Sequence, residues 1–143
     1  MDRRTKICLW VILLGLANFL VYVVMYWYLW GEAINGRVEI LNGQALYFLH
    51  RNEHPVSKAM FIYSGIHSIS IPLTVGAIML AMLTLAKERI SSSMRSAIIR
   101  GRTLLTILAV VIAAIVVIWM GAFICQFAGH FQTAAAVSLP IAR

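Results

Sequence analysis

Three long uncharged stretches dominate the pattern of hydrophobic and polar positions along this chain. They run over residues 7–30, 59–86 and 103–128. Each is longer than the ~20 residues that an α-helix needs to cross a bilayer, and none shows the alternation typical of barrel strands. Because a lipid interior leaves unpaired backbone groups without water, these continuous apolar runs predict three transmembrane helices.

The composition agrees with a membrane protein. Of the 143 residues, 62% are hydrophobic and 12% are charged, against ~45–50% and ~25% in soluble domains. The mean hydropathy is +0.87. These values exclude a disordered chain, a soluble nucleic-acid binder and a disulfide-stapled secreted domain. We therefore predict an all-α integral membrane fold that forms a single membrane domain over residues 1–143.

The Lys and Arg residues, which give a net charge of +7, predict the orientation. With three spans, the N-terminus and an inner basic loop at residues 87–102 lie on the same side, and they carry three and five basic residues. The positive-inside rule makes that side cytoplasmic and the C-terminus external, in a bacterial inner membrane. We expect the basic residues of the loop to contact lipid headgroups rather than nucleic acid. These residues are Lys87, Arg89, Arg95, Arg100 and Arg102.

A β-hairpin is predicted inside the outer loop, residues 31–58. Residues 37–49 contain two short strands around Asn42-Gly43, a pair favoured in two-residue type I′ turns. A lone hairpin is marginally stable in water, so its apolar side chains are expected to rest on the membrane surface, the helix ends or another chain. The alternative is an irregular loop.

Other segments outside the spans carry weaker signals. His50 and His54 have a spacing that could ligate a metal on a helix, but Pro55 favours an extended His54, so we expect solvated histidines. The serines at residues 91–93 suggest an interruption of the helical structure, followed by an N-cap for the third helix. The tail, residues 131–143, is expected to fray.

Polar residues inside the first two spans form a predicted intramembrane cluster. At ~1.5 Å per residue, His67 lies about 8 Å and Tyr22 about 6 Å outward of their span centres, so the two can meet at one depth. Asn18 lies one helical turn before Tyr22, and several serines share the face of His67. The cluster comprises Asn18, Tyr22, Ser64, His67, Ser68 and Ser70.

Two interpretations of this cluster remain open. The polar groups can be interhelical hydrogen bonds that hold the helices together. Alternatively, His67 can bind haem b or a quinone, because ionisable groups in lipid often mark such sites. A second axial histidine at that depth would have to come from a second copy. We favour packing, which requires no cofactor and no metal.

Small residues on the third span suggest a helix-packing face. Gly121, Cys125 and Gly129 recur every four residues, a spacing that lets helices approach closely. Cys8 and Cys125 fall at opposite ends of their spans, too far apart for a disulfide.

The outer loop and the start of the second span resemble small multipass proteins of bacterial inner membranes. The resemblance is carried by Asn35-Gly36, Glu39, Asn42-Gly43, Leu46-Tyr47-Phe48-Leu49, Val56-Ser57, Tyr63-Ser64 and His67. It implies no activity, cofactor or catalytic residue. In size and topology the chain is also similar to the three-helix cytochrome b anchor subunits of succinate dehydrogenase, by architecture alone.

The sequence favours a non-catalytic interaction or accessory subunit over an enzyme. No nucleophile–base pair, carboxylate dyad or phosphate-binding loop is visible in it. Three helices bury little surface by themselves, so we expect a homo-oligomer or a larger membrane complex in the lipid bilayer. One alternative is a haem b or quinone-binding anchor that uses His67. A second is a small pore-forming or holin-like protein.

Overall fold

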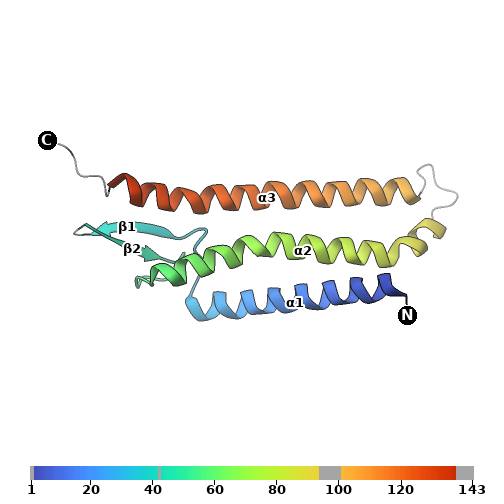
Figure 1. Cartoon of the computed structure of the whole chain (residues 1–143), viewed down its shortest axis with the longest axis horizontal. Coiled ribbons are helices and arrows are strands. Elements are labelled where there is room, and N and C mark those ends of the chain that lie inside the picture. Colours follow the sequence, from blue (N-terminus) through green and yellow to red (C-terminus); the bar gives the residue numbers. More distant parts are fainter. Residues whose placement is uncertain (1, 42, 94–100, 138–143) are drawn as a thin grey trace. The chain divides into compact units, whose positions relative to one another are not determined.

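The computed structural model describes residues 2–41, 43–93 and 101–137. It contains three long helices (Figure 1), and in chain order a two-stranded sheet comes between the first and the second. The elements are α1 (Arg3–Leu29), β1 (Arg37–Leu41), β2 (Gln44–Phe48), α2 (Lys58–Ser93) and α3 (Gly101–Val137). The predicted fold class, all-α with a short hairpin between helices one and two, is confirmed.

Each helix contains a stretch long and apolar enough to cross a membrane. These stretches are Arg3–Leu29, Lys58–Lys87 and Thr103–Gln132. Of the residues in the most apolar window, only 6% are buried within the chain in the first and third, and 17% in the second. Because so much exposed apolar surface is unfavourable in water and suited to hydrocarbon, the helices are candidate membrane spans by length and composition, which implies contact with lipid.

Strands β1 and β2 pair antiparallel as a tight hairpin. Leu41 pairs with Gln44 and Arg37 with Phe48. This register leaves two residues for the turn, as the Asn42-Gly43 pair predicts. Gly43 has a φ of +78°, in the left-handed region that such turns require; Asn42 lies outside the described residues. The hairpin, rather than an irregular loop, is confirmed.

The helices contribute to two compact units of the chain. The first unit combines Met1–Leu20 with Pro72–Trp119. The second combines Val21–Ile71 with Met120–Arg143, so it contains the hairpin, the end of α1, the start of α2 and the C-terminal part of α3.

In the first unit, a polar contact and a small residue join neighbouring helices. Asn18 Nδ2 donates a hydrogen bond of 3.3 Å to Thr74 Oγ1. On α2, a Cβ at Gly76 would collide with the side chain of Val116 on α3. Both features are typical of helix association in lipid, where close approach and hydrogen bonds replace the hydrophobic effect.

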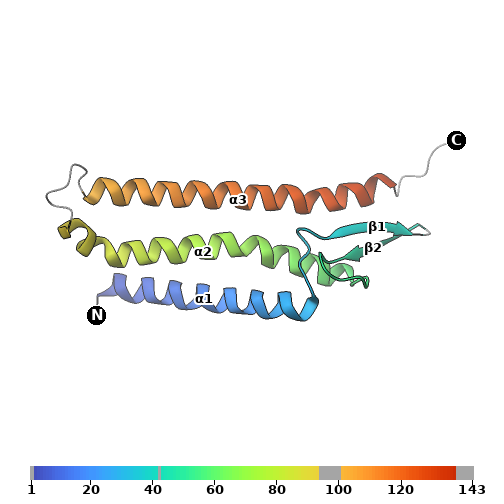
Figure 2. The ribbon, with the colours of Figure 1, turned by 180° about the vertical axis from the view of Figure 1, so that it is seen from behind.

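The second unit has an aromatic core beneath the hairpin. Phe61, fully buried on α2, has its ring centroid 5.3 Å from Tyr47 of β2 and 5.9 Å from Phe127 of α3. The Val56 amide donates to the Tyr47 carbonyl at 2.8 Å, which brings β2 to the segment entering α2 (Figure 2). The hairpin therefore rests on the helix ends rather than standing alone. The buried core residues are Leu29, Ala33, Tyr47, Leu49 and Phe61.

Two helices continue beyond their predicted ends. α2 includes the serines at residues 91–93, which we expected to precede the third helix; serine costs a helix only about 0.5 kcal/mol per residue, so these three need not end it. α3 continues to Val137, into the tail expected to fray. The packing of Phe131 holds this part in place, since its ring lies 5.2 Å from Phe127 and 6.5 Å from Tyr47.

Candidate functional site

The site begins at a sharp reversal of the chain after α1. Trp30 has a φ of +56° and Gly31 a φ of +136°. The Gly31 amide donates to the Tyr26 carbonyl at 3.0 Å, the six-residue closure typical of a Schellman cap. A Cβ on Gly31 would lie 2.8 Å from the backbone nitrogen of Arg51. Both the backbone angle and the close approach therefore require glycine here.

The reversal turns the carboxylate of Glu32 back toward α1 and α2. The hydroxyl of Tyr22 on α1 donates to Glu32 Oε2 at 2.5 Å, and Ser68 on α2 donates to the same oxygen at 3.5 Å. The side-chain amide of Asn35 donates to Oε1 at 2.6 Å. Hydrogen bonds to an ionised carboxylate are about twice as strong as neutral ones. Glu32 thus links three parts of the second unit.

The loop segment that follows Glu32 is buried against α2 and α3. Ala33 and Ile34 are both 0% exposed. The Ala33 amide donates to Ser64 Oγ on α2 at 3.1 Å. His130 on α3 donates from Nε2 to the Ile34 carbonyl at 3.0 Å. Buried backbone groups are stabilised only when paired in this way, so both helices hold the segment in position.

Further along, Asn35 joins the loop segment to α3 and to the segment after β2. Its side-chain oxygen accepts from Gln126 Nε2 at 3.2 Å. Its backbone carbonyl accepts from His50 Nδ1 at 3.1 Å. His50 and His54 are both exposed, as expected of solvated histidines, and His50 also makes this hydrogen bond. The backbone amide of His54 donates to Asn52 Oδ1 at 2.9 Å.

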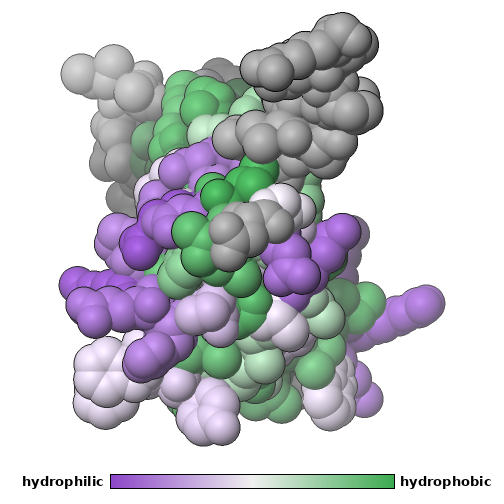
Figure 3. All heavy atoms as spheres, turned by 90° about the vertical axis from the view of Figure 1, so that its left-hand side faces the viewer, coloured by the Kyte–Doolittle hydropathy of each residue, from purple (hydrophilic) through white to green (hydrophobic). Residues whose placement is uncertain are grey.

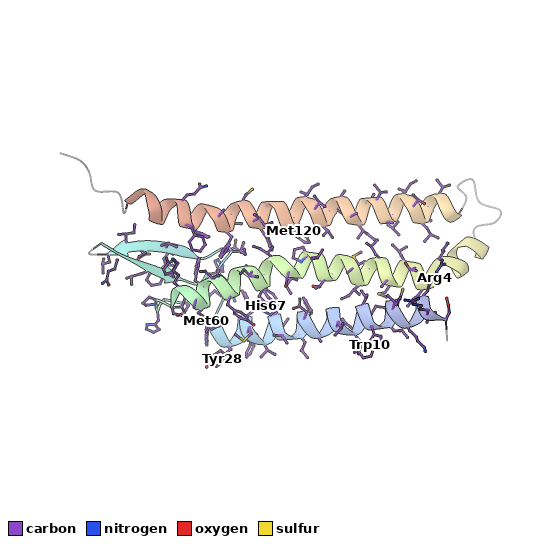
Figure 4. The ribbon with its side chains drawn as sticks, in the orientation of Figure 1. Arg4, Trp10, Tyr28, Met60, His67 and Met120 are labelled. Carbon is purple, nitrogen blue, oxygen red and sulfur yellow. The ribbon has the colours of Figure 1, made fainter. Side chains whose placement is uncertain are left out.

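His67 lies on α2 (Figure 4), and its ring contacts two tyrosine rings. Its ring centroid is 5.7 Å from that of Tyr22 and 5.6 Å from that of Tyr63, both edge-on. Nε2 is buried and has no hydrogen-bond partner among the described residues. A cavity of about 10 Å³ adjoins His67, Tyr22 and Glu32, which is roughly the space that one water molecule needs.

This cavity does not fit the cofactor that the alternative interpretation requires. Pockets for drug-sized ligands and cofactors measure about 300–1,000 Å³, whereas the space beside His67 is about 10 Å³. The rings of Tyr22 and Tyr63 pack edge-on against the imidazole. Within one copy of the chain, the space beside His67 is suited to a water molecule.

The structure brings together part of the predicted polar cluster. Tyr22, Ser64 and Ser68 reach the Glu32 loop segment, and His67 packs on Tyr22. Asn18 belongs to the other unit, where it bonds Thr74. Ser70 turns its hydroxyl to the His67 carbonyl of its own helix, at 2.7 Å. These two hydrogen bonds of Asn18 and Ser70 are made within and between helices.

Sequence reasoning missed Glu32 itself. Its position just after the first span is that of an ordinary charged residue of the outer loop. The available signal was Gly31, since glycine directly after a helix end is typical of a cap that reverses the chain. Such a reversal can return the next side chain to the helix that has just ended.

The expected packing face on α3 is not the one used in the second unit. A Cβ added to Gly121 would meet no atom within 4 Å. Instead Gly65 on α2 admits the ring of Phe127, which would collide with a Cβ there. The choice of face follows from the aromatic core, which Phe127 joins at Phe61.

The predicted headgroup contacts lie mostly at helix ends. Lys87 is exposed on α2, at the end of the second candidate span. Arg89 lies near the end of α2 and Arg102 in the first turn of α3. Arg95 and Arg100 fall outside the described residues.

The arrangement as a whole is a hydrogen-bonded clamp. Three donors converge on one carboxylate, and two helices bind the backbone of the adjoining loop segment. Such an arrangement fixes the connection between α1 and the hairpin in one conformation. No protein-family model, curated protein or solved structure was found to match the chain.

Proposed function

We propose that this chain is a non-catalytic accessory subunit of the bacterial inner membrane, with its N-terminus in the cytoplasm and its C-terminus outside. In this proposal the segment between α1 and α2, residues 30–57, is a docking head for other subunits of a membrane complex or for further copies of the chain. The observation that carries the proposal is the clamp at Glu32, which fastens this head to the helix ends.

A fastened head is better suited to docking than a loose loop. Ordering a flexible segment on binding costs free energy, about 0.5–1.5 kcal/mol for each immobilised side chain. Here Ala33, Ile34 and Leu49 are fully buried within the chain, so most of the ordering has already taken place during folding. The head would meet a partner as a preformed surface.

The hairpin supplies the exposed part of that surface. Leu41 is 62% exposed although it is apolar. On the same strand, Arg37 and Glu39 form an exposed ion pair at 2.6 Å. In the view onto the hairpin end of the molecule, hydrophilic residues gather with apolar ones between them (Figure 3). An apolar centre with a charged rim is the usual composition of a protein interface.

Blue-native electrophoresis of gently solubilised native membranes tests this proposal. The wild-type chain should migrate well above its monomer mass of 16.0 kDa, and Leu41→Ser should shift it toward the monomer. Glu53→Gln, at another exposed position of the head, is the matched control and should leave the complex intact. Carbonate extraction verifies that each variant is inserted. A wild-type chain that runs only as a monomer, or a complex indifferent to Leu41→Ser, would contradict the proposal.

A further inference from the structure

Arg51 is held at the C-terminal end of α1 by its two neighbours in the chain. The His50 amide donates to the Glu32 carbonyl at 3.0 Å. Asn52 donates from Nδ2 to the carbonyl of Leu29 at 3.3 Å. Leu29 is the last residue of α1. Because both flanking residues are tied to this helix end, the backbone of Arg51 is fixed beside it. Its side chain is a positive charge held at the level where the first span ends.

Around this charge lies a groove lined by aromatic rings. The groove has a volume of about 220 Å³, and Tyr26, Trp27, Trp30 and Arg51 line it. Trp27 is 82% exposed and Trp30 71% exposed. Trp and Tyr concentrate at the membrane–water interface, where one part of the ring system is in hydrocarbon and the polar atom is among headgroups. The groove therefore lies at headgroup depth.

A second, apolar groove continues from the first along α1. It has a volume of about 460 Å³ and is lined by Val23, Val24, Trp27 and Tyr28. Trp27 lines both grooves, so they lie next to each other on α1. Residue 23 lies one helical turn before Trp27, which takes the apolar groove about 6 Å deeper into the span at ~1.5 Å per residue. The guanidinium of Arg51 therefore lines the first groove, and the aliphatic side chains of Val23 and Val24 line the second.

No described carboxylate neutralises Arg51. Within the described part of the chain the one ion pair is that of Arg37 with Glu39 on the hairpin. A guanidinium offers paired N–H donors that match a phosphate, and it is less strongly hydrated than an ammonium group. Arg51 is therefore available to a phosphate at the same depth.

We propose that these two grooves bind one phospholipid with an anionic headgroup. Its phosphate contacts Arg51 and the rim of Trp30, and an acyl chain lies past Trp27 against Val24. The aromatic rings alone would also suit the quaternary ammonium of a choline lipid, but the unneutralised guanidinium selects a headgroup with net negative charge. This inference depends on the spans and does not depend on the accessory role proposed above.

Tryptophan quenching by brominated lipids tests the proposal on the full chain in nanodiscs. Trp10→Phe and Trp119→Phe leave Trp27 and Trp30 as the fluorophores. Dibromo-phosphatidylglycerol at a low mole fraction in phosphatidylcholine should quench them more than dibromo-phosphatidylcholine at the same fraction. One basic group near an anionic surface favours anionic lipid roughly fivefold. The quenching curves should therefore show phosphatidylglycerol enriched over phosphatidylcholine beside Trp27 and Trp30 by a factor of that order.

Variants at exposed positions separate the groove from general electrostatics. Arg51→Gln should abolish the preference for phosphatidylglycerol over phosphatidylcholine in the quenching experiment. Arg51→Lys should keep part of this preference, because the charge remains without the paired donors. Lys58→Gln removes an exposed charge at the start of α2 and should leave the preference unchanged. A preference that survives Arg51→Gln, or that Lys58→Gln removes equally, would overturn the proposal.

Two further outcomes decide against a lipid at this site. Equal quenching by the two brominated lipids would show that the groove does not select anionic headgroups. Loss of the preference on addition of millimolar sn-glycerol 3-phosphate would show that an anion without acyl chains satisfies Arg51. Persistence of the preference in that solution supports binding of the intact lipid.

Discussion

The hydroxyl of Tyr22 lies 2.5 Å from the carboxylate of Glu32, to which it donates a hydrogen bond. Ten residues separate the two in sequence, and the cap at Trp30 and Gly31 brings them together. The same carboxylate accepts from Ser68 on α2. One acidic side chain therefore connects the end of α1, the head and the start of α2, and its removal should loosen all three.

Glu32→Gln should lower the free energy of unfolding by about 1–3 kcal/mol. The amide replaces one acceptor oxygen with a donor, so one of the bonds from Tyr22, Ser68 or Asn35 is lost in a partly buried site. Thermal unfolding in detergent, followed by circular dichroism, measures the change. Glu53→Gln changes an exposed carboxylate of the same head and should unfold like the wild type; equal unfolding of the two variants would contradict the clamp.

Tyr22→Phe should destabilise the protein by about 1–2 kcal/mol, because it removes the donor hydroxyl and keeps the ring that packs on His67. Tyr28→Phe, at a side chain that is 76% exposed, is the control and should have little effect. Combined with Glu32→Gln in a double-mutant cycle, Tyr22→Phe should show a coupling of about 0.5–3 kcal/mol. Strict additivity would mean that the two residues do not stabilise one another.

Gly65→Ala and Gly121→Ala should have opposite effects on stability. A Cβ at Gly65 would collide with the ring of Phe127, and overpacking of this kind costs about 1–3 kcal/mol. At Gly121 a Cβ meets nothing within 4 Å, and alanine favours the helix by roughly 0.5–1 kcal/mol. Melting temperatures of the two variants measure the difference. If both were neutral, the packing of α3 on α2 in the second unit would be looser than described.

Gly31→Ala should be more damaging than Gly43→Ala. Both glycines have positive φ, but only Gly31 has a backbone atom, the Arg51 nitrogen, 2.8 Å from where a Cβ would lie. Strained backbone conformations cost about 1–3 kcal/mol, and at Gly31 the steric clash adds to that cost. Chemical denaturation of both variants gives the comparison, and a larger loss at Gly43 would contradict the account of the cap.

The spans and the hairpin were predictable because each depends on local sequence. A continuous apolar run is a membrane helix whatever it packs against, and Asn42-Gly43 favours a two-residue turn by its own backbone preferences. The contact of Tyr22 with His67 followed the same kind of argument, since helix rise fixes the depth of each ring. Periodicity and turn chemistry are enough for these features.

The clamp and the end of α3 were not predictable because they depend on distant residues. Gly31 indicates a reversal of the chain, but nothing near Glu32 in the sequence indicates that Tyr22 and Ser68 will donate hydrogen bonds to its carboxylate. In the sequence, Phe131 is simply the first residue of the tail. Its packing against Tyr47 and Phe127 appears only in the folded chain. The small residues at regular spacing on α3 do not mark the face used within the chain, because the aromatic core around Phe61, not the spacing, decides which side packs there.

Cysteine accessibility tests the central claim, that three helices cross a bilayer and leave the head and the N-terminus on opposite sides. Cys8 and Cys125 are replaced by alanine, and Glu53→Cys and Asp2→Cys are introduced one at a time. In intact cells a membrane-impermeant maleimide should label Glu53→Cys, and it should reach Asp2→Cys only after the membrane is permeabilised. Equal labelling of both positions in intact cells would contradict the three-span account.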